Sequence, residues 1–81
     1  MNHDSVRSRR RRVVLAGYDG DTGFITRSLT DPDARVRALA LSAAERAGVL
    51  TPPMLASGAS DPEPEVRAAV CRLAAGHSHF D

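Results

Sequence analysis

The sequence predicts an all-α fold, a fragment of a right-handed α-solenoid built from about five helices arranged as helical hairpins. The segment DPDARVRALALSAAERAG begins at Asp31, and a similar segment, DPEPEVRAAVCRLAAG, begins thirty residues later at Asp61. Each carries small and apolar residues at the three- and four-residue spacing of one helix face. The chain has no tryptophan and few other aromatic residues. Its core is therefore expected to consist of alanine, leucine and valine, which let helices approach closely.

The repeat explains why so short a chain resembles itself. A shift of thirty residues aligns Val36 with Val66 and Arg37 with Arg67, as well as the two Asp-Pro pairs. A helical pair of this length cannot bury its apolar side alone, so a fixed period indicates that each pair covers its neighbour. The repeats are expected to span residues 9–76.

A first helix is expected near residues 9–17. The repeat phase places Arg9 and Arg10 at core-facing positions, where burial of a charge is strongly unfavourable. We therefore expect packing only from Val13 onward, and a disordered basic N-terminus over residues 1–8.

Short helices are expected near residues 21–29 and 52–59. Thr51 before Pro52 is a typical helix start, and Leu50, Met54 and Leu55 supply apolar positions after it. Asp21 occupies the position of Thr51 thirty residues earlier. The repeating unit is thus a short helix, an Asp-Pro turn and a longer helix.

Longer helices are expected near residues 33–47 and 62–75. Asp-Pro followed by an acidic residue provides a capping acceptor, a preset φ and negative charge at the positive end of the helix dipole. Asp31 and Asp33 both remain candidates for the cap of the first of these helices. Gly48 and Gly76 mark the expected ends, and residues 77–81 are expected to form a frayed tail.

The last helix is expected to leave an apolar face without a neighbour. This face comprises Val66, Ala69, Val70 and Leu73. Exposed apolar faces lower solubility. The expected consequences are a longer array of repeats or end-to-end self-association.

The charge is concentrated near the start of the chain. Residues 1–12 carry five arginines and one aspartate, whereas the remainder carries six arginines and nine acidic residues. Clustered arginine binds phosphate through release of counterions, and no aromatic residue interrupts the run to stack on bases. Sequence-indifferent binding of nucleic acid or of an anionic surface is therefore one hypothesis, and a solvated, solubilising segment is the other. The candidate phosphate-binding residues are Arg7, Arg9, Arg10, Arg11 and Arg12.

The single cysteine excludes an internal disulfide, and no secretory signal or membrane-spanning apolar run is found. A cytoplasmic location is expected. Cys71 occupies the repeat position of Leu41 and is expected to be a small buried hydrophobic residue. Together with His3, His77 and His79 it lacks the arrangement of a metal site, so neither a metal nor another cofactor is expected.

No catalytic constellation is found. The sequence contains no nucleophile beside a base, no Gly-x-Ser-x-Gly motif and no phosphate-cradling loop. We therefore expect a protein that is not an enzyme.

The two Asp-Pro segments resemble HEAT repeats, in particular the short thirty-residue variety found in phycobilisome lyase-type proteins. The resemblance covers about residues 19–76 and rests on Asp-Pro with Val-Arg at a fixed offset, twice at one period. It implies a hydrogen-bonded ladder between successive repeats, formed by Asp31 or Asp33 with Arg37 and by Asp61 with Arg67. A module that attaches or detaches a bilin is implied by the resemblance alone.

A non-enzymatic scaffold is the expected function. In a solenoid the second helices of the hairpins usually line the concave surface, where partners bind. Exposed positions of these helices that differ between copies are expected to contact another protein, whose identity the sequence does not indicate. These positions are Arg35, Ser42, Glu45, Arg46, Glu65 and Arg72.

Overall fold

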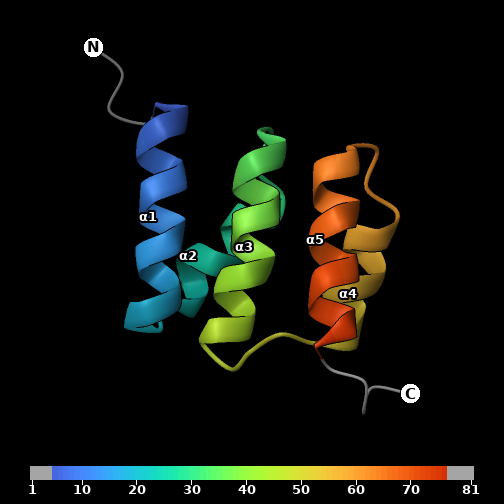
Figure 1. Ribbon diagram of the computed structural model, residues 1–81. Coiled ribbons are helices and arrows are strands. Elements are labelled where there is room, and N and C mark those ends of the chain that lie inside the picture. The colour runs from blue at the N-terminus through green and yellow to red at the C-terminus, as the bar shows by residue number, and fades with distance from the viewer. Residues whose placement is uncertain (1–4, 77–81) are drawn as a thin grey trace.

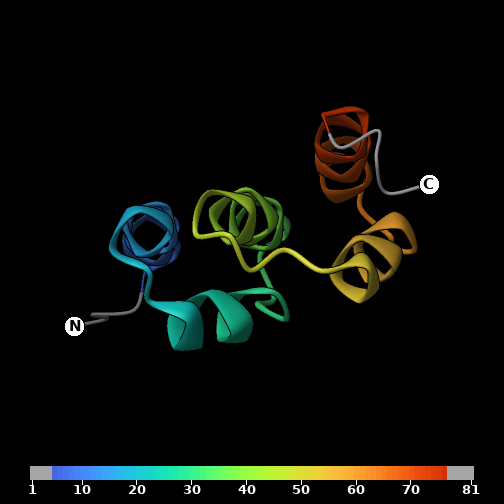
Figure 2. The same ribbon diagram turned by 90° about the horizontal axis from the view of Figure 1, so that it is seen from below.

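The computed structural model describes residues 5–76, which form five helices in two layers. Helices α1, α3 and α5 lie side by side and run in the same direction, whereas α2 and α4 lie on one side of them (Figures 1 and 2). The prediction of an all-helical chain with about five helices is confirmed, and residues 5–76 contain no strand. The helices are α1 (Val6–Asp19), α2 (Thr22–Ser28), α3 (Ala34–Arg46), α4 (Pro52–Ala59) and α5 (Pro64–Ala75).

Helix α1 is longer than expected. It begins at Val6, so residues 6–8, predicted to be disordered, are helical. The Ser5 hydroxyl accepts a hydrogen bond from the Ser8 N–H at 3.2 Å and caps the helix. The rest of the predicted disordered segment, residues 1–4, and the predicted frayed tail, residues 77–81, lie outside the described residues.

Side-chain caps fix the starts of three further helices. Asp21, Asp33 and Thr51 each accept a hydrogen bond from the N–H three residues later, at 3.2, 3.0 and 3.3 Å respectively. Asp33, and not Asp31, is therefore the cap of α3. Asp31 instead accepts a hydrogen bond from the Asp33 N–H at 2.9 Å and shapes the turn before the cap.

Two glycines end the helices that precede the short ones. Gly20 after α1 and Gly48 after α3 both have φ of 77°, a left-handed conformation that glycine adopts without steric strain. Gly76 was also expected to stop a helix, and it follows α5 with a φ of −77°. This last end therefore does not depend on the conformational freedom of glycine.

The core consists of two clusters that share α3. Val13, Ile25 and Val36 are fully buried where α1, α2 and α3 meet, whereas Leu41 and Val66 belong to the cluster between α3, α4 and α5. Of the two valines at equivalent repeat positions, Val36 is 0% exposed and Val66 is 1% exposed. Helix α3 thus packs on both sides.

Two expectations about α5 were wrong. Val66, Ala69 and Val70 were expected to face outward, but they are buried within the chain. Cys71 was expected to be buried, but it is exposed. The equivalent Leu41 is covered by α5, and no described helix covers the corresponding side of α5.

Small residues permit the close approach of α1 to α3. A Cβ atom at Gly17 would lie only 2.9 Å from the Ala43 Cα and 3.0 Å from its Cβ. Because the first of these atoms belongs to the backbone, the conflict cannot be relieved by rotation of a side chain. Gly17 therefore sets the distance between the two helices.

We expect Gly17→Ala to lower the free energy of unfolding by about 1–3 kcal/mol, because it forces α1 away from α3. Urea denaturation followed by circular dichroism measures this loss. Gly23→Ala is the matched control, since its Cβ would meet no atom closer than 3.8 Å. Equal stability of the Gly17→Ala variant and the parent chain would contradict this account of the packing.

Candidate functional site

An arginine–aspartate ladder joins neighbouring hairpins. The Nε and Nη2 atoms of Arg37 donate to the two carboxylate oxygens of Asp61, at 2.8 and 2.9 Å. Its Nη1 donates to the Asp31 carbonyl oxygen at 2.8 Å. One guanidinium thus holds the turn before its own helix and the turn before the next long helix, in the bidentate geometry that arginine makes with carboxylates.

The same contact joins α1 to the turn before α3. Arg9 donates through Nε to Asp31 Oδ2 at 2.8 Å and through Nη2 to Oδ1 at 3.4 Å. Arg67 repeats only the inner half of the contact, because its Nη1 donates to the Asp61 carbonyl oxygen at 2.8 Å. All four residues implied by the resemblance take part in the ladder, but each carboxylate pairs with the arginine of the preceding long helix.

Sequence reasoning missed Arg9 as a ladder residue. Arg9 precedes Arg37 by 28 residues, so the thirty-residue alignment does not match them. Gly20 precedes Gly48 by the same 28 residues, which is a signal that could have revealed the shorter spacing. The repeat phase predicted core-facing positions for Arg9 and Arg10. Their side chains instead pair with Asp31 and Asp33 at the edge of the core.

The ladder changes the titration of its members. The hydrogen bond from Arg37 holds the pKa of the Asp61 carboxyl below its ordinary value, while partial burial opposes this shift. The same hydrogen bond raises the pKa of Arg37. Asp33 behaves alike, since the hydrogen bond from Arg10 lowers the pKa of its carboxyl. The Arg37 and Asp61 side chains are 16% and 11% exposed, so water screens this pair less than a surface pair.

The predicted phosphate-binding run does not form one continuous basic face. Arg9 and Arg10 are paired with Asp31 and Asp33, the second pair at 3.0 and 3.1 Å. Arg12 stacks over the Phe24 ring, 4.1 Å from its centre. The other two candidates, Arg7 and Arg11, are exposed and lie one helical turn apart on α1.

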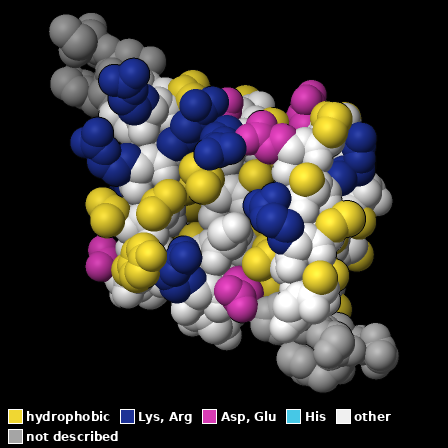
Figure 3. All heavy atoms as spheres, in the orientation of Figure 1, with side chains coloured by type: hydrophobic (Ala, Val, Ile, Leu, Met, Phe, Trp, Pro, Cys, Tyr) yellow, Lys and Arg dark blue, Asp and Glu magenta, His cyan; other side chains and the backbone are white. Residues whose placement is uncertain are grey.

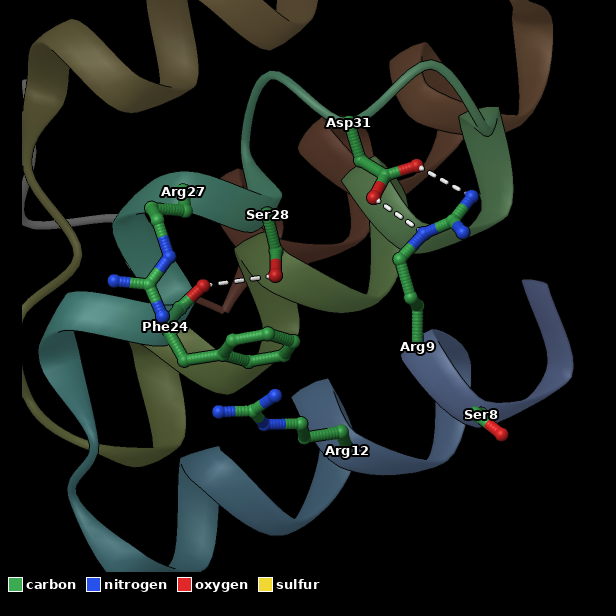
Figure 4. A pocket seen from close by; sticks show the side chains of 7 residues that line it. All are labelled: Ser8, Arg9, Arg12, Phe24, Arg27, Ser28 and Asp31. Carbon is green, nitrogen blue, oxygen red and sulfur yellow. Dashed lines mark hydrogen bonds and ion pairs between the residues drawn. The ribbon is translucent and has the colours of Figure 1, made fainter. Parts of the chain in front are cut away.

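A hollow of about 330 Å³ lies between α1 and α2 (Figure 4). Phe24 lines this hollow, and the guanidinium carbons of Arg12 and Arg27 lie 4.1 and 5.6 Å from the centre of its ring. The Arg9–Asp31 pair lies on the other side of the hollow. The two cations cover a phenyl ring that is only 8% exposed. Sequence reasoning did not identify this hollow, because Arg27 lies outside both the arginine run and the aligned ladder.

Four of the six predicted partner-binding residues border one groove. The groove between α3 and α5 has a volume of about 310 Å³. Arg35 Nη1 contacts Glu65 Oε2 across it at 3.2 Å, and Ser42 and Arg72 lie farther along the two helices. The apolar part of the lining comprises Ala38, Leu39 and Ala68.

The remaining two predicted residues, Glu45 and Arg46, do not line this groove. The guanidinium carbon of Arg46 lies 4.5 Å from the centre of the Tyr18 ring on α1, and Glu45 is exposed near the end of α3. Figure 3 views α1, α3 and α5 from the side away from the short helices and shows acidic, basic and apolar side chains intermixed. The predicted residues thus occupy two parts of this surface.

A more apolar hollow of about 370 Å³ lies between the short helices. Leu29, Met54 and Val66 contribute to its lining, and the Arg37–Asp61 pair forms part of its wall. The sequence did not predict it, because its walls come from turns and helices of both hairpins.

Within residues 5–76, no three histidine, cysteine or acidic side chains lie together as metal ligands would. None of the described helices has both the length and the apolar character required to cross a membrane. No protein-family model matches the chain, and searches of curated proteins and of solved structures found no match either.

A double-mutant cycle tests the ladder. We expect Arg37→Met and Asp61→Asn each to lower the free energy of unfolding by about 1.5–3 kcal/mol, with a combined effect well below the sum. Asparagine still accepts the hydrogen bond from the Glu63 N–H, for which Asp61 Oδ1 is the acceptor at 2.9 Å. Arg35→Met with Glu65→Gln is the control cycle, and its coupling should stay below about 1 kcal/mol because that pair is exposed. Additive effects of the ladder variants would contradict the proposed coupling.

The lowered pKa values of Asp33 and Asp61 predict a loss of stability in acid. Their ordinary pKa is 3.8, so as the pH falls below this value the unfolded chain takes up protons that the folded chain does not. The stabilisation is present above this pH and is lost as the pH falls through the folded-state pKa values. Urea denaturation at a series of acidic pH values should show a steeper loss for the parent chain than for Arg37→Met. The same slope for both would contradict the assignment to Asp61, and Arg35→Met should retain the parent slope.

Proposed function

We propose that the chain is a HEAT-like solenoid fragment that acts as a non-enzymatic scaffold and binds another protein through the concave row formed by its second helices, α3 and α5. The similar construction of the hairpins α2–α3 and α4–α5 supports the first part. Each has a capped short helix, an aspartate-led turn and a longer helix whose arginine donates to that turn. Such units bury their apolar sides against one another and leave an extended surface for binding.

The groove between α3 and α5 supports the second part of the proposal, the binding of another protein. Ala38, Leu39 and Ala68 provide a narrow apolar lining, and Arg35, Glu65 and other polar residues border it. Protein interfaces commonly combine an apolar centre with a polar rim, and charges of both signs determine orientation and partner choice. The partner is therefore expected to present a small apolar side chain flanked by charged groups.

Binding of nucleic acid or of an anionic surface remains the alternative prediction. The contacts of Arg9, Arg10 and Arg12 with Asp31, Asp33 and Phe24 favour the scaffold, because these arginines already serve the packing of α1. Binding of polyanions would depend mainly on Arg7 and Arg11. It would weaken steeply with salt.

Variants on the groove separate these functions. After a partner has been isolated with the intact chain and purified, we expect Arg72→Glu and Ser42→Glu to weaken its binding at least tenfold with unchanged helical content. The control variant, Arg7→Ala with Arg11→Ala, should bind as the parent does. Calorimetry at several salt concentrations measures both effects. Groove variants that bind like the parent, or steep salt dependence abolished by the control variant, would refute the proposal.

A further inference from the structure

The side of α5 that faces away from α3 carries a row of small exposed residues. Ala68 borders the groove toward α3, whereas Pro64, Cys71 and Ala75 lie beside it at helical spacing, and these three are exposed. Together with Arg67 they form what we call the outer face of α5. Thirty residues earlier, Leu41 occupies the position of Cys71, and this residue of α3 is only 2% exposed because α4 and α5 cover it.

Arg67 is equivalent to Arg37, but fewer of its guanidinium donors are hydrogen-bonded. Its Nη1 donates to the Asp61 carbonyl oxygen at 2.8 Å, as the Nη1 of Arg37 donates to the Asp31 carbonyl oxygen at 2.8 Å. In Arg37 the Nε and Nη2 atoms bind the Asp61 carboxylate. The corresponding atoms of Arg67 have no hydrogen-bond partner among the described residues. The guanidinium is thus anchored on one side, and the edge that binds a carboxylate is open.

Two helix faces within the chain are equivalent to the outer face of α5, and both are covered in the same way. Helix α3 packs on α1 and brings Asp31 to Arg9, and α5 packs on α3 and brings Asp61 to Arg37. In both cases a helix lies on the row of small or apolar residues, and the aspartate of its preceding turn binds the arginine. The third arginine in this series is Arg67.

We propose that the outer face of α5 binds a helical hairpin of a different protein chain, whose turn presents an aspartate to the Nε and Nη2 atoms of Arg67. The helix after that turn packs on Cys71 and Ala75, whose small side chains permit close approach. The bidentate contact fixes the register of the two helices. This surface lies on another side of α5 from the Arg35–Glu65 bridge, so the inference does not rest on the proposed function of the groove.

Charge complementarity argues against a second copy of this chain as the partner. The residues of α3 that pack toward α1 include Val36, Ala40 and Ala43. The 28-residue offset places Ser8, Arg12 and Leu15 at the corresponding positions of α1. A copy stacked in the same direction would therefore place a cationic helix beside Arg67, where like charges repel. A partner with an apolar helix and an aspartate avoids this conflict.

A synthetic peptide of residues 49–76 tests the proposal, since its sequence supplies one short helix, the Asp61 turn and one long helix. A helical pair of this length does not bury its apolar side alone, so its helices are expected to form as it binds the outer face of α5. The peptide carries Cys71→Ser to prevent oxidation and is titrated into the full chain by calorimetry. We expect saturable binding with one peptide per chain. Arg67→Met in the protein should weaken binding at least tenfold, Asp61→Asn in the peptide should do the same, and the two changes together should cause little further loss.

Arg72→Met in the full chain is the matched control, because it removes an exposed arginine of α5 that lacks the anchoring bond to a turn carbonyl; binding should be unchanged. Absence of saturable binding, or equal binding by the Arg67→Met protein, would overturn the inference. Sedimentation of the full chain should show a monomer. Self-association that disappears in the Arg67→Met protein would instead assign the face to a second copy and overturn the proposed partner.

Discussion

The packing of α3 against both of its neighbours is the constraint on which the rest of the structure depends. Ala40, Ala43 and Ala44 are almost completely buried, and each removes little apolar surface from water because its side chain is small. Such a core gains stability from close approach more than from large side chains, and its packing cannot loosen without loss of dispersion contacts. Gly17 belongs to this arrangement, since no side chain fits between α1 and α3 at its position.

The ladder fixes the relative position of neighbouring helices, which the small side chains of the core specify only weakly. Rows of alanine would tolerate several relative positions of two helices, whereas a bidentate contact between Arg37 and Asp61 permits one. Arginine suits this role better than lysine, because its planar group donates at the same time to the carboxylate and to the carbonyl oxygens of Asp31 and Pro32. The charges lie at the edge of the core, where they remain partly hydrated, so the cost of burial is smaller than in a dry interior.

The sequence was sufficient for the helices and their order, because capping residues and helical spacing are local signals. Asp21, Thr51 and Gly48 act at the helix ends where the sequence predicted them, whereas Gly20, which sequence reasoning did not single out, ends α1. The exposure of Cys71 could not be read in the same way, because burial at a repeat position depends on whether another helix covers it. The groove followed in part from comparison of exposed positions between copies. The hollows did not, because their walls combine residues from turns and helices outside the aligned positions.

The two outer sides of the long-helix layer differ in how they meet solvent. On α1 the side chain of Arg12 covers Phe24 from one direction, and Arg27 approaches the ring from another. Two cations therefore separate this aromatic core residue from water. On α5 no described residue gives the small side chains such a cover, and beside them lies the edge of Arg67 that has no hydrogen-bond partner within residues 5–76. A cation stacked on a ring retains its hydration while it shields apolar surface. An exposed row of small residues next to an anchored guanidinium has the opposite character, because both its apolar surface and its open donors gain free energy from a suitable neighbour. The outer sides of α1 and α5 correspond to opposite sides of α3, one packed toward α1 and the other toward α5, and their chemistry therefore differs.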